Sequence, residues 1–144
     1  MTIDTKFEDN IKIYGYPNEF LQVLLNIFNN AKDVLKEKES NERFIEIRTF
    51  TLNDNVIIKV SDSGGGIDES IITKIFEPYF TTKHKSQGTG IGLYMSHQII
   101  VEHMKGEIYA KNIELIRDDK KYKGCAIIMA LPLNKNKIEE DYII

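Results

Sequence analysis

A single aspartate followed by closely spaced glycines is the part of this sequence best suited to chemistry. Asp62 stands just after an apolar run at residues 56–60, and Gly64 and Gly66 follow it. A second glycine cluster stands at residues 88–92, with a polar and basic segment before it. Glycine lets backbone approach a ligand closely, and free N–H groups at a helix start bind phosphate. The pattern therefore indicates a nucleotide site with a movable segment across it.

Asp62 has two readings at this stage. An aspartate beside glycine often caps a turn through its own backbone. Alternatively, its ionised carboxylate accepts a hydrogen bond from the exocyclic amine of adenine. Guanine presents a carbonyl there, so the second reading predicts selection of adenine. Gly64 and Gly66 would then let the chain turn beside the ring.

Three asparagines, Asn26, Asn29 and Asn30, lie where apolar residues recur at helical spacing. Asparagine is a mediocre helix former, and residues that break a local rule are candidates for function. Asn26 and Asn30 are four positions apart, so they share one helix face. A side-chain amide oxygen suits Mg²⁺. The competing reading is a solvated helix surface.

Four blocks, in this order, resemble the sequence boxes of sensor histidine kinases. Residues 25–31 resemble the asparagine box, 62–66 the first glycine box, 76–83 the phenylalanine box and 88–93 the second glycine box. The resemblance runs over residues 15–132 and concerns the catalytic and ATP-binding domain of that family. It implies the Bergerat-type ATP-binding fold, with ATP and Mg²⁺ as ligands.

The resemblance also implies roles for individual residues. It makes Asn26 and Asn30 the catalytic residues, with Asn30 as the Mg²⁺ ligand and Asn26 as support for the phosphate site, and it makes Asp62 the acceptor for adenine. Residues 81–89 correspond to the ATP lid, from which Lys83 would reach the phosphates. The residues expected to contact the nucleotide are Asn30, Asp62, Gly64, Gly66, Ile67, Phe76, Phe80, Thr82, Lys83, Gly88, Thr89, Gly90, Ile91, Gly92 and Leu93.

The apolar pattern predicts an α/β two-layer sandwich, with a mixed, mostly antiparallel sheet that carries helices on one face. Residues 44–50 and 55–60 form a hairpin through Asn53 and Asp54, and residues 113–124 are a long hairpin loop or a pair of extended arms. The expected strands are residues 11–14, 44–50, 55–60, 106–110 and 125–131, and the expected helices are residues 20–38, 71–76 and 91–104.

Phe76, Tyr79 and Phe80 are expected to pack rather than do chemistry. The apolar residues at helical spacing in the asparagine-rich helix are Phe20, Leu21, Leu24, Leu25, Phe28, Ala31 and Leu35.

The length of 144 residues predicts a single domain, residues 1–144, with residues 1–10 and 134–144 as flexible ends. A formal net charge of −3 and a pI near 5.6 argue against a nucleic-acid binder. The lone Cys125 is expected to be a buried thiol in a reducing compartment.

No run has membrane-spanning length and no signal peptide is recognisable. We therefore expect no membrane contact by this segment and a cytoplasmic location, free or as the cytoplasmic part of a membrane-anchored sensor.

Two positions distinguish this sequence from relatives of the same superfamily. The ATPases and serine kinases typically carry a glutamate one helical turn before the magnesium asparagine, and here that position is Asn26. A neutral imidazole already has a free lone pair and needs less help from a base, so this position favours histidine phosphorylation. Many histidine kinases carry a basic residue where Asp33 stands, which puts a phosphate-binding role for Asp33 in doubt.

No histidine of this chain resembles the phosphoacceptor. His84 lies in the predicted lid, and His97 and His103 lie in the predicted helix 91–104. The acceptor is therefore expected on a separate histidine-bearing dimerisation domain of the same kinase, with a response regulator downstream. The alternatives are a stand-alone nucleotide-binding module of the superfamily, an ATPase, or an anti-sigma-type protein kinase.

Overall fold

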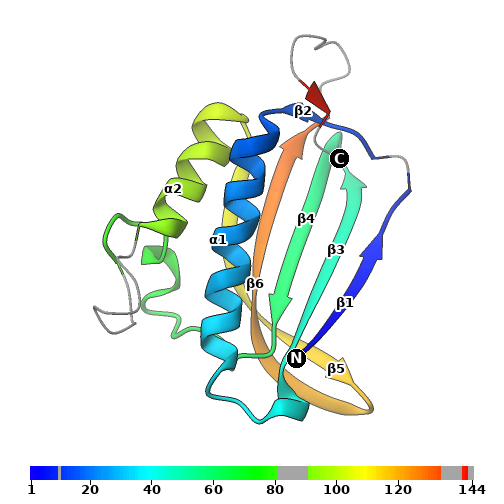
Figure 1. The fold of residues 1–144 in the computed structure, drawn as a ribbon, viewed down its shortest axis with the longest axis vertical. Coiled ribbons are helices and arrows are strands. Elements are labelled where there is room, and N and C mark those ends of the chain that lie inside the picture. Colours follow the sequence, from blue (N-terminus) through cyan, green and yellow to red (C-terminus); the bar gives the residue numbers. More distant parts are fainter. Residues whose placement is uncertain (10, 81–90, 134–140, 143–144) are drawn as a thin grey trace.

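One five-stranded sheet forms the base of the molecule, and the helices lie on one of its faces (Figure 1). This computed structural model describes residues 1–9, 11–80, 91–133 and 141–142. The strand order is β1-β3-β4-β6-β5. Only β1 and β3 run parallel in this sheet, and its other neighbouring pairs are antiparallel. The mixed, mostly antiparallel α/β sandwich predicted from the sequence is confirmed.

The first strand lies earlier than the apolar pattern predicts. The segment 1–10, predicted as a flexible end, contains β1 (Thr2–Phe7), which pairs with β3 (Phe44–Leu52). The strand predicted at residues 11–14 is reduced to β2 (Tyr14–Gly15), which pairs with β7 (Asp141–Tyr142). Every residue of β1 is exposed at the sheet edge, and Ile3 and Phe7 are its two large apolar residues, so its sequence gives only a weak strand signal. Residues 134–140 and 143–144 lie outside the described residues.

Two hairpins supply the other four strands. β3 and β4 (Asn55–Asp62) meet at Asn53 and Asp54, whose φ angles are 51° and 62°. β5 (Glu107–Arg117) and β6 (Lys120–Pro132) meet at Asp118 and Asp119, with φ angles of 51° and 63°. Two central residues with positive φ fit the twist of a two-residue hairpin, and Asn and Asp tolerate this conformation. Residues 113–124 are therefore extended arms, one of the two forms predicted.

Helix α1 (Pro17–Leu35) begins with a proline, which fits the first helical turn because that turn leaves its N–H groups unpaired. Past its end, the Arg43 guanidinium donates to the carbonyl oxygens of Lys38 at 2.7 Å and Lys36 at 2.9 Å. These bonds hold the chain where it turns back towards β3. The helix begins three residues earlier and ends three residues earlier than predicted.

The buried face of α1 consists of Phe20, Val23, Ile27, Ala31 and Leu35. Leu21 and Leu25, two of the apolar residues at helical spacing, are 54% and 47% exposed and so lie outside this buried face. Aliphatic residues occur on two neighbouring faces of this helix, and only contact with the sheet decides which face is buried.

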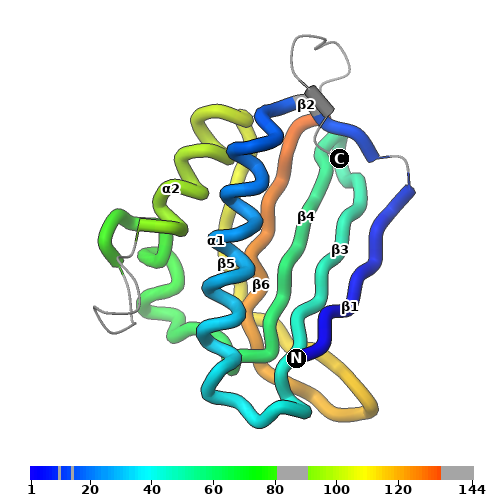
Figure 2. Tube along the Cα trace, in the orientation of Figure 1, coloured from blue at the N-terminus to red at the C-terminus, as the bar shows by residue number. Residues whose placement is uncertain are grey.

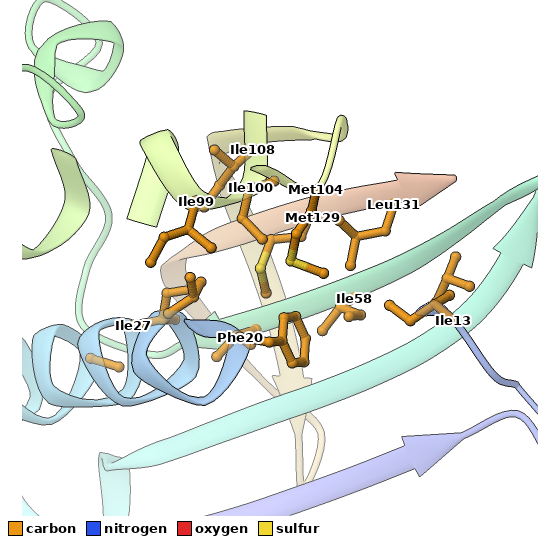
Figure 3. Close-up of a cluster of buried hydrophobic side chains, with 14 of the residues drawn as sticks. Ile13, Phe20, Ile27, Ile58, Ile99, Ile100, Met104, Ile108, Met129 and Leu131 are labelled. Carbon is orange, nitrogen blue, oxygen red and sulfur yellow. The ribbon is translucent and has the colours of Figure 1, made fainter. Parts of the chain in front are cut away.

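The predicted helix 91–104 is α2 (Gly92–Gln98) followed by the π-helical turn η3 (Ile99–His103). The predicted helix 71–76 is a single 3₁₀ turn, η2 (Ile72–Lys74), and another 3₁₀ turn, η1 (Ser40–Glu42), precedes β3. The tube in Figure 2 shows α1 and α2 side by side on the sheet, and the two helices are in contact. Figure 3 shows the core between these layers, with labelled residues from α1, the π-turn and the sheet: Phe20, Ile27, Ile58, Ile99, Ile100 and Met129.

Candidate functional site

A cavity of about 670 Å³ opens between α1, strands β4 and β6, the segment 63–71 and the start of α2. This volume is in the range of pockets that bind small organic ligands. The fold brings residues of the asparagine-rich helix and of both glycine segments to this one cavity. The predicted site residues that line it are Asn26, Asn30, Asp62, Gly64, Gly66, Ile67, Phe80, Ile91, Gly92 and Leu93.

Asp62 is the last residue of β4 and lines the cavity. Its Oδ1 accepts the backbone N–H of Gly64 at 2.9 Å, so the turn-capping reading is correct. Burial raises the pKa of the Asp62 carboxyl above 3.8, and hydrogen bonds from the backbone of Gly64 and Cys125 oppose that rise. A carboxylate has about four acceptor positions, so capping is compatible with a further bond to a ligand amine.

Apolar residues surround this carboxylate. Val60 and Asp62 on β4 pair in register with Ile127 and Cys125 on β6, and all four line the cavity. Burial, followed by the neighbouring Asp62 charge, raises the pKa of the Cys125 thiol to about 12. The predicted buried thiol is confirmed, and it is protonated at neutral pH. An apolar wall with one carboxylate suits a planar base that carries an amine.

Gly124 allows β6 to approach the end of β4. A Cβ atom placed on Gly124 would lie 1.7 Å from the carbonyl oxygen of Asp62. No side chain fits in that space, because real Cβ contacts are far longer. Glycine at this position thus brings Cys125 beside Asp62.

Asn26 joins the two helices at the rim of the cavity. Its Nδ2 donates to the carbonyl oxygen of Gly92 at 3.1 Å and to the Ser96 hydroxyl at 3.2 Å. Its Oδ1 accepts from Gln22 at 3.2 Å, and Ser96 also donates to Gly92. Both ends of this amide are therefore engaged with protein groups. The arrangement fixes the start of α2 against α1.

Asn30 lines the cavity one turn after Asn26, and Asn29 and Asp33 line it as well. The ammonium of Lys36 lies 3.4 Å from the Asp33 carboxylate, an i,i+3 pair in which Lys36 is exposed and Asp33 is half-buried. Among the described residues, no group of three or more His, Cys, Asp or Glu side chains could hold a metal ion. Asn30 offers a single side-chain oxygen, so a metal bound there would need further ligands.

The two phenylalanines of the phenylalanine box have different surroundings. Phe80 lines the cavity, whereas Phe76 packs against the core and meets the His97 ring at a centroid distance of 5.9 Å. The prediction that Tyr79 packs is wrong, because it is 74% exposed. Its φ of 64° turns the chain at this point. Of the predicted nucleotide contacts, Thr82, Lys83, Gly88, Thr89 and Gly90 lie outside the described residues, as does His84.

Sequence reasoning missed several residues that line the cavity. Cys125 and Ile127 reach it only because β6 pairs with β4 in one register. Spacing along the chain carries no signal for this, although the glycine before Cys125 marks a close approach. The other lining residues outside the predicted set include Gln22, Val34, Ile71, Ile75 and Met95.

The comparison with family models gives a match over residues 15–135. The family is described as "Histidine kinase-, DNA gyrase B-, and HSP90-like ATPase". This chain belongs to that family. None of the helices in the described part of the chain is long and apolar enough to cross a membrane.

Individual relatives place the chain within the sensor histidine kinases of this family. Sporulation kinase E of Bacillus subtilis is 35% identical over 132 residues, which are 92% of this chain and 16% of that protein. The sensor histidine kinase ZraS of Salmonella typhimurium is 40% identical over 103 residues, 72% of this chain and 21% of that protein. The chain thus spans less than a quarter of the length of these relatives.

Solved structures agree with this placement. The catalytic domain of the histidine kinase ThkA superposes with a TM-score of 0.70 at 30% identity, covering 91% of this chain and 79% of that one. ThkA in complex with the response regulator protein TrrA gives a TM-score of 0.68 at 27% identity, covering 94% of this chain and 36% of that one. The chain corresponds to a histidine kinase catalytic domain.

Proposed function

We propose that this domain binds Mg-ATP in the cavity and transfers the γ-phosphoryl group to a histidine on a separate dimerisation domain, in two-component signalling. The observation that carries the proposal is the placement of Asp62. Its carboxylate stands in an apolar wall, in the same cavity as Asn30 and the first residues of α2. This arrangement offers one end for a base and another for phosphates.

At the base end, Asp62 accepts a hydrogen bond from the adenine amine. The half-buried carboxylate is costly to hold in an apolar wall, and a ligand donor offsets that cost. Ile67, Ile71 and Ile127 provide apolar surface for the ring. Guanine places a carbonyl at the amine position, which would repel the carboxylate.

At the phosphate end, the side-chain oxygen of Asn30 supplies a hard ligand suited to Mg²⁺. Asn30 supplies one oxygen donor at the cavity, and an ion that arrives with the nucleotide would bring phosphate oxygens as further ligands. Bound Mg²⁺ would neutralise charge on the triphosphate and orient it for in-line transfer. Asn26 holds the start of α2 in place at this end.

The acceptor histidine comes from outside the described residues of this chain. His103 pairs with Glu19 at 2.8 Å, and His97 stacks near Phe76, so both have structural contacts. Catalysis then consists of positioning and charge neutralisation, and the imidazole of a docked domain supplies the nucleophile. A response regulator downstream is supported by the complex of the similar kinase ThkA with TrrA.

Incubation with γ-labelled ATP tests this function. The chain alone should bind Mg-ATP, hydrolyse it slowly and gain no acid-labile phosphate. With the dimerisation domain of its own kinase added, that domain should gain a label stable in alkali and labile in acid. Strong acid-labile labelling of the isolated chain would contradict the proposal. Fast steady ATP turnover would favour an ATPase, and binding without transfer would favour a nucleotide-binding module.

A further inference from the structure

Asn112, in the middle of β5, contacts the segment 63–71 that walls the cavity on one side. This segment lies between β4 and η2 and contains no strand or α-helix. Gly64, Gly66 and Ile67 from it line the cavity, but Asn112 does not. An irregular segment keeps its shape only where its backbone polar groups find partners.

The Asn112 amide pairs with the backbone of Ile67 at both ends. Oδ1 accepts the Ile67 N–H at 2.7 Å, and Nδ2 donates to the Ile67 carbonyl oxygen at 2.5 Å. Nδ2 also donates to Glu69 Oε1 at 3.0 Å. An asparagine amide has two donors and an acceptor oxygen, so both donors and the oxygen are engaged. Ile67 thus pairs with Asn112 as it would with a neighbouring strand.

The Asn112 amide also leaves no room for a side chain at position 66. A Cβ on Gly66 would lie 2.9 Å from Asn112 Oδ1, and Gly66 has a φ of 87°. One residue earlier, the Gly65 N–H donates to the Lys123 carbonyl oxygen at 2.9 Å. The β5–β6 hairpin therefore binds this segment at Gly65 and at Ile67. The contact at Gly65 is between backbone groups, whereas the contact at Ile67 is made by the Asn112 side chain.

We propose that Asn112 is a positioning residue for the adenine end of the site: its amide holds Ile67 and Gly66 in the conformation that receives the base. This inference rests on the proposed function, because it assumes that the cavity binds ATP. The role differs from general support of the fold. It predicts a loss of affinity confined to the base end of the ligand, since the hydrogen bonds of Asn112 go to Ile67 and Glu69, in the segment that follows Asp62.

The experiment compares Asn112→Ala with the wild-type chain in two measurements. Amide hydrogen exchange by NMR reports whether Ile67 N–H is protected in the nucleotide-free protein. Calorimetry with adenosine, and with ATP in the presence and absence of Mg²⁺, reports which end of the ligand loses affinity. Asn55→Ala is the matched control, because Asn55 also donates to a backbone carbonyl, at the far end of β4.

In Asn112→Ala we expect Ile67 N–H to exchange faster and the dissociation constants for adenosine and ATP to rise by the same factor, about tenfold. The factor by which Mg²⁺ strengthens ATP binding should not change, and Asn55→Ala should bind like wild type. Asn112→Asp keeps the shape and the acceptor for Ile67 N–H but loses the donor. It should weaken adenosine binding as well, which keeps the test available if the alanine variant fails to fold.

Three results would overturn the inference. They are wild-type adenosine affinity in both Asn112 variants, unchanged exchange of Ile67 N–H in Asn112→Ala, and a loss that appears only with Mg-ATP. If the wild-type chain itself bound neither adenosine nor ATP, the proposed function would fail. If the wild-type chain bound adenosine and ATP, and the Asn112 variants bound them equally well, only the role of Asn112 would be ruled out.

Discussion

Asp62 and Cys125 face each other as register partners on β4 and β6, and both line the cavity. The carboxylate and the thiol each have a raised pKa, mainly because of burial. A half-buried carboxylate in an apolar wall costs folding free energy, and a ligand that donates a hydrogen bond to it offsets part of that cost. A change at Asp62 should therefore alter the stability of the protein, the pKa of the Cys125 thiol and the affinity of the cavity for its ligand.

Replacing Asp62 with asparagine should stabilise the nucleotide-free protein while weakening ATP binding. The folded pKa of Asp62 lies above 3.8, so its favourable contribution to folding is present below that pH and is lost as pH rises through the folded pKa. At neutral pH the ionised group thus costs stability. Thermal unfolding should show a higher melting temperature for Asp62→Asn, and calorimetry an ATP affinity weaker by about 1–3 kcal/mol. Asp118→Asn, in the β5–β6 turn, is the control. A lower melting temperature together with unchanged ATP affinity would rule out this account of Asp62.

The affinity for ATP should depend on pH through the protonation of the Asp62 carboxyl. Because its pKa is raised above 3.8, protonation should begin at a higher pH than for an ordinary aspartate. ATP affinity should therefore fall as the pH drops towards the raised pKa, and this step should be missing from Asp62→Asn. Titrations at a series of pH values measure it. Parallel profiles for the two proteins would assign the pH dependence to some other group.

Cys125 should react slowly with thiol reagents. A pKa of about 12 leaves little thiolate at pH 8, and the residue is 4% exposed. Labelling with a chromogenic disulfide should be slow in the native chain, slower with bound ATP and fast after unfolding. Asp62→Asn should label faster than wild type, because the charge that helps to raise the thiol pKa is gone. Rapid labelling of the native wild type would contradict the buried position of this thiol.

Asn26→Ala should loosen the contact between α1 and α2. The change removes the bonds to Gly92 and Ser96, which together should cost about 1–2 kcal/mol of unfolding free energy. Asn26→Glu should be no better, because a carboxylate cannot donate to the Gly92 carbonyl. Denaturant unfolding measures both variants. Asn29→Ala, on an exposed position of the same helix, should be close to wild type. Equal stability of Asn26→Ala and Asn29→Ala would show that the Asn26 contacts contribute nothing.

The sequence predicted the sheet and helices where the signal is local. The Asn53-Asp54 turn and the apolar alternation of β4 are properties of neighbouring residues. The exposed strand β1 gives only a weak strand signal and was not predicted. The apolar spacing predicted α1 but not which of its faces is buried, because Leu21 and Leu25 are as apolar as the residues that face the sheet.

The candidate site was predictable only where its residues form compact motifs. Asp62, Asn30 and Gly92 stand within such motifs and do line the cavity. Cys125 reaches Asp62 through strand register, and Asn112 reaches Ile67 across 45 positions of sequence. Contacts of this kind depend on how strands pair, which a single sequence does not reveal.

Calorimetry of wild-type chain and Asn30→Ala with ATP and GTP, with and without Mg²⁺, tests most directly whether the cavity is a Mg-ATP site. The wild type should bind ATP more tightly with Mg²⁺ and should bind GTP at least about tenfold more weakly. Asn30→Ala should keep its fold and its preference for ATP over GTP but lose most of the strengthening by Mg²⁺. Equal affinity of the wild type for ATP and GTP, with Mg²⁺ acting equally on both proteins, would contradict the account.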